Sequence, residues 1–159
     1  MMKLKILALL GFLTFSGFTS KPADVNFKCL VQLTNYSGEG AYVAVSLLDA
    51  TGKYQKTLYI FGKEKRWYDD LTSWWKFYSA KHESVDAISG ASITPGSRKV
   101  FSFSLDDAYF NKGYKLRFET AVENQDYKEK DLEFEFSSAN VGKSLNGTGY
   151  IRYVKLIGS

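Results

Sequence analysis

One short stretch near the middle of the chain concentrates the residue types that can accept a covalent group. Residues 86–96, Asp-Ala-Ile-Ser-Gly-Ala-Ser-Ile-Thr-Pro-Gly, combine two glycines, a proline, three hydroxyl side chains and an aspartate. Gly and Pro interrupt regular structure and Ser, Thr and Asp compete with it, so this composition predicts a loop. The small neighbours would leave the hydroxyl groups of Ser89 and Ser92 open to another molecule. An acceptor for covalent modification needs that accessibility, whereas a structural turn does not.

The first seven residues of this stretch resemble a known acceptor motif, Asp-x-x-Ser-Gly-Ala-Ser/Thr, which bacterial flavin transferases of the ApbE type recognise. These enzymes use FAD and Mg²⁺ and attach FMN, through its phosphate, to the hydroxyl of the last residue of the motif. The resemblance implies that Ser92 is the acceptor, although Thr is commoner at that position, and that Mg²⁺ acts only transiently during attachment. The implied recognition frame consists of four residues: Asp86, Ser89, Gly90 and Ala91.

Two alternatives to this assignment remain open at the level of the sequence. Thr94 lies two residues after Ser92, so a shift of register would move the acceptor to Thr94. The other alternative is a solvated Gly/Ser turn that matches the motif by accident. For the modification to occur, residues 89–94 must lie in an exposed loop, and we expect them to do so.

Other residue types that commonly carry catalysis or bind metals are scarce. His82 is the only histidine and Cys29 the only cysteine, so the chain lacks the ligands of a standard zinc site. A Ser-His-Asp triad would have to use His82, and a lone histidine in a loop is usually just solvated. Asp106, Asp107 and Asn111 offer oxygen ligands for Ca²⁺, but they lack the order of an EF-hand loop, and an acidic turn is more often a solvated corner. We therefore expect no catalytic residue, no metal site and no stand-alone enzyme.

The first twenty residues are typical of a secretory signal peptide, and we expect them not to be part of the folded domain. Lys3 and Lys5 form a basic start, residues 6–18 are mostly apolar, and polar residues follow. Such a stretch is too short for a comfortable transmembrane span. The cleavage site is poor, with Phe18 at minus three if the cut follows Ser20, so an uncleaved anchor remains an alternative. We expect an exported, periplasmic protein.

The mature portion, residues 21–159, has the length of one domain with an adequate core. It carries 19 basic and 17 acidic residues, a net charge of +2. This near-neutral balance, without a basic run interleaved with aromatic residues, is unlike a nucleic-acid channel, and we expect no nucleic-acid partner. Cys29 has no partner for a disulfide bond, so we expect it to be a small buried hydrophobe in a strand.

Alternating apolar and polar residues predict strands through most of the mature chain. The clearest alternation spans residues 114–122, and similar runs bring the count to about seven strands separated by turn signals. Gly52 supplies the positive φ of a predicted hairpin turn at residues 49–52. The pattern is typical of an all-β fold, an immunoglobulin-like antiparallel β-sandwich without the Cys–Trp–Cys spacing of antibody domains.

The alternation also predicts which side chains face the core. We expect Leu116, Phe118 and Phe134 to lie between the two sheets, because they share one face of their strands. Arg117 and Glu133 fall on the opposite, outer face. Substitution of these two charged residues is expected to cost little stability.

Residues 68–80 interrupt the strand pattern and predict a short helix, near residues 69–79, inserted between the third and fourth strands. Its apolar stripe recurs at i, i+3, i+4 and i+7, and Asp69 or Asp70 is expected to cap its start. We expect this helix to pack over one end of the sandwich with its tryptophans in the core. The region also offers aromatic surfaces on which an isoalloxazine ring could stack: Trp67, Trp74, Trp75, Phe77 and Tyr78.

The order of these segments carries a second resemblance, which covers most of the mature chain. A hairpin with Asp-Ala-Thr-Gly-Lys-Tyr-Gln-Lys-Thr-Leu-Tyr is followed by the Trp-rich helix, the motif stretch and a strand Gly-Tyr-Lys-Leu-Arg-Phe-Glu. This order is similar to a family of predicted periplasmic proteins of unknown function, distantly similar to the immunoglobulin-like domain of the flagellar hook-capping protein. Members of that family are associated with extracytoplasmic flavinylation and electron transfer, which the resemblance implies here as well.

Two functions follow from these observations. The first is an exported flavin carrier with FMN on Ser92, served by a flavin transferase and by a membrane or periplasmic redox partner; the cofactor would supply the chemistry and the protein its position and environment. The alternative is a cofactor-free, immunoglobulin-like module for binding or assembly in the periplasm. An enzyme acting on an exported substrate is a third class, for which the sequence offers no constellation of residues.

Overall fold

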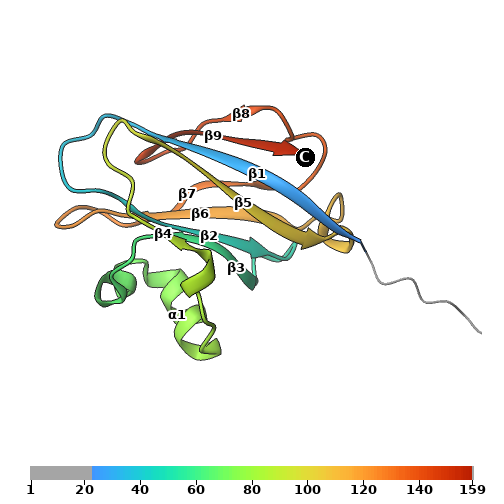
Figure 1. Ribbon diagram of the computed structural model, residues 1–159, viewed down its shortest axis with the longest axis horizontal. Helices are drawn as coiled ribbons and strands as arrows, with labels where there is room; N and C mark the ends of the chain where they lie inside the picture. Colours follow the sequence, from blue (N-terminus) through green and yellow to red (C-terminus); the bar gives the residue numbers. More distant parts are fainter. Residues whose placement is uncertain (1–22, 159) are drawn as a thin grey trace, which may run out of the picture.

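Two β-sheets face each other in the computed structural model, which describes residues 23–158 (Figure 1). The first sheet has the order β5-β1-β9-β8 and contains β1 (Asp24–Leu33), β5 (Arg98–Asp106), β8 (Ser144–Leu145) and β9 (Ile151–Gly158). The second has the order β4-β3-β2-β6-β7 and contains β2 (Tyr42–Leu48), β3 (Tyr54–Phe61), β4 (Ser89–Gly90), β6 (Lys115–Ala121) and β7 (Lys128–Glu135). The predicted signal peptide lies outside the described residues.

The predicted all-β sandwich is confirmed, with seven strands of seven or more residues and two strands of two residues. Neighbouring strands are antiparallel except for β3 and β4, which pair in parallel. The predicted hairpin joins β2 to β3, and Gly52 has the expected positive φ of 88°. No helix within the described residues 23–158 is long and apolar enough to cross a membrane.

The main core lies between the sheets and follows the predicted alternation. Leu116 and Phe118 of β6 are fully buried there, as expected, and Cys29 of β1 is fully buried too. Burial raises the pKa of the Cys29 thiol far above its ordinary value. Phe134 is only partly buried at the border of this core, stacked on Phe118 with ring centroids 6.0 Å apart. The core takes side chains from β1, β5 and β9 of the first sheet and from β2, β3, β6 and β7 of the second.

An insertion between β3 and β4 carries the helical part of the chain. It contains the 3₁₀ helix η1 (Lys65–Asp70), the α-helix α1 (Thr72–Lys81) and the 3₁₀ turn η2 (Asp86–Ile88). The inserted helix is confirmed, but its predicted cap is wrong. The N-cap residue of α1 is Leu71, without a side-chain cap, because Asp69 and Asp70 belong to the preceding 3₁₀ helix. The buried carboxylate of Glu119 instead accepts a hydrogen bond from the backbone N–H of Trp74 at 3.1 Å.

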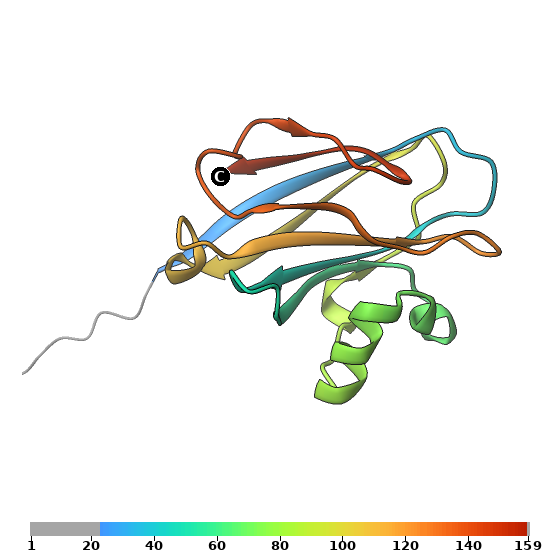
Figure 2. The same ribbon diagram turned by 180° about the vertical axis from the view of Figure 1, so that it is seen from behind.

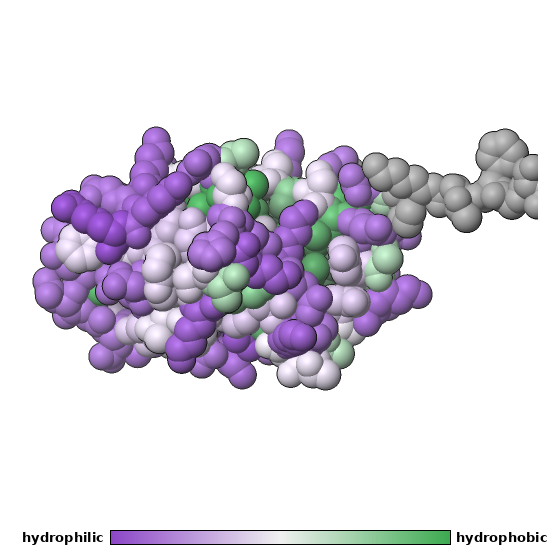
Figure 3. All heavy atoms as spheres, turned by 90° about the horizontal axis from the view of Figure 1, so that it is seen from below, coloured by the Kyte–Doolittle hydropathy of each residue, from purple (hydrophilic) through white to green (hydrophobic). Residues whose placement is uncertain are grey.

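The insertion covers the outer face of the second sheet, and the expectation that it would pack over one end was wrong (Figures 1 and 2). Trp74 and Tyr68 pack there against Ala44 and Ile60, which point away from the main core. Their burial creates a second, smaller core on that face. The exposed surface on this side is mainly hydrophilic, with small apolar areas between charged residues (Figure 3).

Charged side chains on the outer face of β6 are also buried. Arg117 is 4% exposed, with the ring of Tyr54 beside its guanidinium, and Glu119 is fully buried where the first turn of α1 reaches it. The Arg117 guanidinium donates to Glu133 at 2.6 Å, and Glu119 accepts from the hydroxyl groups of Tyr54 and Tyr127. Arg117 therefore lies on the outer face, as predicted, but its side chain is buried there, which contradicts the expectation that its substitution costs little.

Candidate functional site

The first half of the motif stretch is held in regular structure, so the prediction of a loop throughout was wrong. Ser89 and Gly90 form β4, which pairs with Ile60 and Phe61 of β3. The backbone N–H of Gly62 also donates to the Gly90 carbonyl oxygen at 2.7 Å. A Cβ at Gly90 would stand 2.7 Å from the Tyr59 hydroxyl oxygen, so this close approach requires glycine.

The second half of the motif is attached to the start of β2. Ala41 and Ile93 exchange two backbone hydrogen bonds of 2.8 and 3.0 Å, and the Ile93 side chain is fully buried. This anchor sets Ser92 beside Gly40, where a Cβ would stand only 2.8 Å from Ser92 Oγ. The Ser92 hydroxyl makes no hydrogen bond with the described residues, and its side chain is partly exposed.

The other hydroxyl groups of the motif lie in different surroundings. Ser89 Oγ donates to the Asp86 carbonyl oxygen at 3.2 Å. Thr94 is exposed at the first position of a turn, in which the Ser97 N–H donates to the Thr94 carbonyl and Gly96 has a φ of 71°. The structure therefore separates Ser92, which faces a cavity, from Thr94, which lies on the turn beyond it. Ala91, next to Ser92, is exposed as the sequence predicted.

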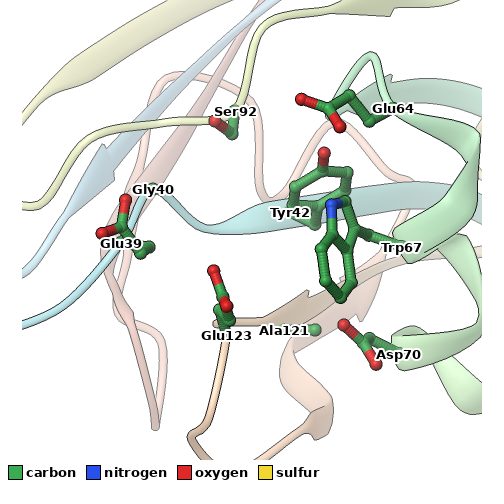
Figure 4. Close-up of a pocket in the computed structure, with 9 residues that line it drawn as sticks. All are labelled: Glu39, Gly40, Tyr42, Glu64, Trp67, Asp70, Ser92, Ala121 and Glu123. Atoms are coloured by element: carbon green, nitrogen blue, oxygen red, sulfur yellow. The ribbon is translucent and has the colours of Figure 1, made fainter.

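The cavity that Ser92 faces has a volume of about 170 Å³. Four segments that are far apart in the sequence enclose it: the start of β2, the insertion, the loop after β4 and the end of β6. Figure 4 shows Ser92, Gly40 and Glu39 on one side and the insertion on the other. The lining residues are Glu39, Gly40, Tyr42, Glu64, Trp67, Asp70, Ser92, Ala121 and Glu123.

Carboxylates dominate the charge of this cavity. Glu39, Glu64, Asp70 and Glu123 line it, and among the described lining residues none is lysine or arginine. All four carboxylates are exposed at the rim. Partial burial, with a contribution from neighbouring Asp69, raises the pKa of Asp70. The cavity is thus a negatively charged recess in which an uncharged ligand group meets less electrostatic opposition than an anion.

The wall opposite Ser92 is aromatic and consists of Tyr42 and Trp67 (Figure 4). Gly62 leaves the space for Tyr42, since a Cβ there would come within 2.0 Å of the tyrosine ring. Burial raises the pKa of the Tyr42 hydroxyl. Trp67 is half-buried, and the guanidinium of Arg66 lies 5.1 Å from the centre of its ring. Tyr42 and Trp67 therefore present hydrophobic surface in an otherwise polar cavity.

Asp86, the first residue of the motif, is exposed and does not line the cavity. Its carboxylate lies 2.8 Å from the ammonium group of Lys65, which hydrogen-bonds to it and lowers its pKa. Because Lys65 begins the 3₁₀ helix that carries Trp67, this ion pair connects the start of the motif with the aromatic wall. Exposed pairs of this kind add little stability.

Sequence reasoning identified some parts of this site and missed others. Ser92 was a predicted acceptor and Trp67 one of five predicted stacking partners. The contributions of Glu39, Gly40 and Glu123 were missed, because they come from two loops that are far apart in the sequence and meet at one end of the sandwich, and they carry no local signal. His82 lies at the exposed end of α1 with a φ of 52° and does not line the cavity.

Comparison with known proteins gives one match. A protein-family model described as "Predicted periplasmic protein (DUF2271)" matches residues 24–153. No curated protein and no solved structure matches the chain. The matched region contains the second sheet, the insertion, all residues that line the cavity, and the first sheet up to the third residue of β9.

Proposed function

The chain belongs to the DUF2271 family of predicted periplasmic proteins, and from this premise we propose that it is a flavin carrier with FMN covalently attached to Ser92. The observation that carries the proposal is the setting of the Ser92 hydroxyl. It is the motif hydroxyl that faces a cavity, and it makes no hydrogen bond within the described residues that an incoming group would have to break.

Attachment requires a simple exchange at phosphorus. Ser92 Oγ forms a bond to the FMN-side phosphorus of FAD, the bond between that phosphorus and the bridging oxygen breaks, and AMP leaves. The serine proton passes to a base of the flavin transferase, which also holds the Mg²⁺. The chain gains the mass of FMN less one water, with no change of oxidation state. Gly90 and exposed Ala91 bring no bulky side chain into the path of the transferase.

The attached flavin would supply electron-transfer chemistry, and the chain would position and shield it. In the periplasm the carrier would exchange electrons with a membrane or periplasmic redox partner. No side chain of the motif has to act as a catalyst in this role.

The direct test is co-expression with an active flavin transferase, followed by intact mass measurement and detection of flavin after denaturation. We expect wild type to gain one FMN less water and Ser92→Ala to gain nothing. Ser89→Ala and Asp86→Ala should label more slowly, because they alter the recognition frame and leave the acceptor in place. Thr94→Ala should label fully. If wild type remains unlabelled beside a positive-control acceptor protein, the proposal is wrong, and loss of label in Thr94→Ala alone would move the acceptor to Thr94.

A cofactor-free, immunoglobulin-like binding module is the second candidate, and strand β5 favours it. β5 stands at the edge of its sheet with nine residues, and within residues 23–158 it is paired only with β1. Val100 on this strand is 57% exposed. Such an edge can pair with a strand of a partner protein. An unlabelled wild type in the experiment above would make this the better account.

A further inference from the structure

We propose that the isoalloxazine ring of the flavin on Ser92 stacks on the indole of Trp67. This inference rests on the proposed function and goes beyond it, because it assigns the binding surface and the orientation of the cofactor. It follows from the packing of the aromatic residues, the shape of the cavity and its charge.

The packing of the insertion selects Trp67 from the five aromatic candidates. Trp74 is fully buried, stacks on Tyr78 with centroids 4.7 Å apart, and donates from Nε1 to Thr57. Trp75 packs on the same tyrosine at 5.6 Å. Phe77 stacks on Tyr54 on the far side of α1, at 5.4 Å. Each of these rings packs on another aromatic ring and none of them lines the Ser92 cavity, which leaves Trp67 as the candidate that does.

Trp67 has the features of a stacking platform. Within the described residues its ring contacts no other aromatic ring, and its one ring partner is the Arg66 guanidinium. Arg66 is itself held by Glu64 at 2.6 Å, so the cation and the indole are fixed to the same 3₁₀ helix. Figure 4 shows the indole across the cavity from Ser92, with the Tyr42 ring behind it. A flavin bound through its phosphate to Ser92 would cross this space with its ribityl chain.

The charge of the cavity determines which part of the cofactor can lie beside its carboxylates. The phosphodiester carries a negative charge and is held at Ser92, on the side of the cavity where Ala91 is exposed. The oxidised isoalloxazine ring is uncharged, so it is the part that can lie beside Glu64 and Asp70 at little electrostatic cost. A neutral ring on an aromatic wall is therefore the arrangement that the lining favours.

The size of the cavity limits how far the ring is enclosed. Its 170 Å³ is below the roughly 300–1,000 Å³ of pockets that enclose a drug-sized ligand. The ring would thus rest with one face on Trp67 and keep an edge in solvent. An exposed edge is what electron exchange with a second protein requires.

Flavin fluorescence tests whether the ring stacks on Trp67, because a stacked indole quenches an excited flavin by electron transfer. Fully flavinylated full-length protein is compared with its proteolytic flavinyl peptide and with flavinylated Trp67→Ala, Trp67→Phe and Trp75→Phe. We expect wild-type fluorescence to be several-fold below that of the peptide and Trp67→Ala to recover most of the loss. Trp67→Phe keeps an aromatic ring that is a weaker electron donor than indole. It therefore tests the quenching even if the alanine variant fails to fold. Trp75→Phe, the matched control, should stay quenched.

The outcomes separate the two proposals. In one outcome, wild type gains the mass of the flavin while Trp67→Ala and Trp67→Phe fluoresce as weakly as wild type. In that case the proposed stacking on Trp67 is wrong and the carrier function stands. If Trp75→Phe relieves the quenching instead, the ring lies over α1. If no mass is gained, the carrier function fails and this inference fails with it.

Discussion

Gly40 and Ser92 lie so close together that a Cβ atom on Gly40 would stand 2.8 Å from Ser92 Oγ and 3.3 Å from Ser92 Cβ. Gly40 has no positive φ, so its backbone conformation is one that alanine can adopt. The need for glycine here is spatial. A methyl group added at Gly40 would therefore make its close contacts with the side chain of the acceptor Ser92.

Gly40→Ala is therefore expected to slow flavin attachment by displacing the Ser92 side chain. Because Ser92 is partly exposed and can rotate away, the change should leave folding stability within about 1 kcal/mol of wild type. The measurement is the rate of mass gain with a flavin transferase and FAD. Gly158→Ala, whose Cβ meets its nearest neighbour at an ordinary 3.8 Å, is the control and should label at the wild-type rate. Equal rates for Gly40→Ala and wild type would contradict the prediction.

Phe118→Ala should destabilise the fold by about 3–5 kcal/mol, because it empties a fully buried position between the sheets. Phe134, stacked on Phe118, would lose its ring partner as well. Urea unfolding gives the free energy difference. Arg152→Ala on an exposed position of β9 should lie within about 0.5 kcal/mol of wild type. A similar loss in both variants would mean that the cost does not come from the core.

Arg117→Ala is now expected to destabilise by about 1–3 kcal/mol, because it leaves Glu133 without its closest hydrogen-bond donor in a partly buried place. Lys115→Ala is a matched control, since Lys115 pairs with the same carboxylate at 3.6 Å but is 36% exposed. Its loss should cost less than about 1 kcal/mol. The two unfolding curves, measured under one buffer condition, decide whether the greater burial of Arg117 makes its ion pair with Glu133 the stronger one.

The pH dependence of stability should contain a contribution from Glu119. Burial raises the pKa of this carboxyl above its ordinary value of 4.5, against the opposing hydrogen bonds from Tyr127, Tyr54 and the backbone of Trp74. The folded chain then binds this proton more tightly than the unfolded chain, so the contribution is fully present below pH 4.5 and is lost as the pH rises through the raised pKa.

Glu119→Gln cannot titrate, and its free energy of unfolding should fall less than that of wild type as the pH rises above 4.5. Urea titrations at a series of pH values measure both slopes. Parallel curves for wild type and Glu119→Gln would show that Glu119 titrates alike in both states.

The carboxylates around the cavity should hold the reduction potential of the bound flavin low. Reduction adds negative charge to the ring, and Glu64 and Asp70 beside Trp67 oppose it. Neutralising both in Glu64→Gln/Asp70→Asn should raise the potential of the flavinylated protein in a spectroelectrochemical titration, more at low salt than at high salt. Glu135→Gln, an exposed carboxylate of β7 outside the cavity, should leave the potential unchanged.

The sequence predicted the sandwich because strand alternation is a local property. The burial of Leu116 and Phe118 follows from the alternation of apolar and polar residues around them in the sequence. The burial of Arg117 was missed, because it depends on Tyr54 of β3 and on Glu129 and Glu133 of β7, which no local pattern brings to that side chain. The parallel pairing of Ser89 with Ile60 escaped prediction for the same reason.

The candidate site shows the same limit. Ser92 was identified because its motif is contiguous in sequence. The cavity in front of it was not, because its walls come from four separate segments that only the closed fold brings together. Gly40 is the clearest case. The sequence around it looks like that of an ordinary turn, and nothing there indicates that Ser92 needs the space a side chain would fill.

The burial of Cys29 has a consequence for work in an oxidising compartment. The thiolate is the reactive form of cysteine, and burial in β1 keeps this thiol protonated and out of reach. The folded chain should therefore form no mixed disulfides and need no reductant during purification. A cysteine introduced at exposed Thr94 would be the one accessible thiol of the folded domain, so a spectroscopic reporter could be attached beside the acceptor serine without first removing the native cysteine.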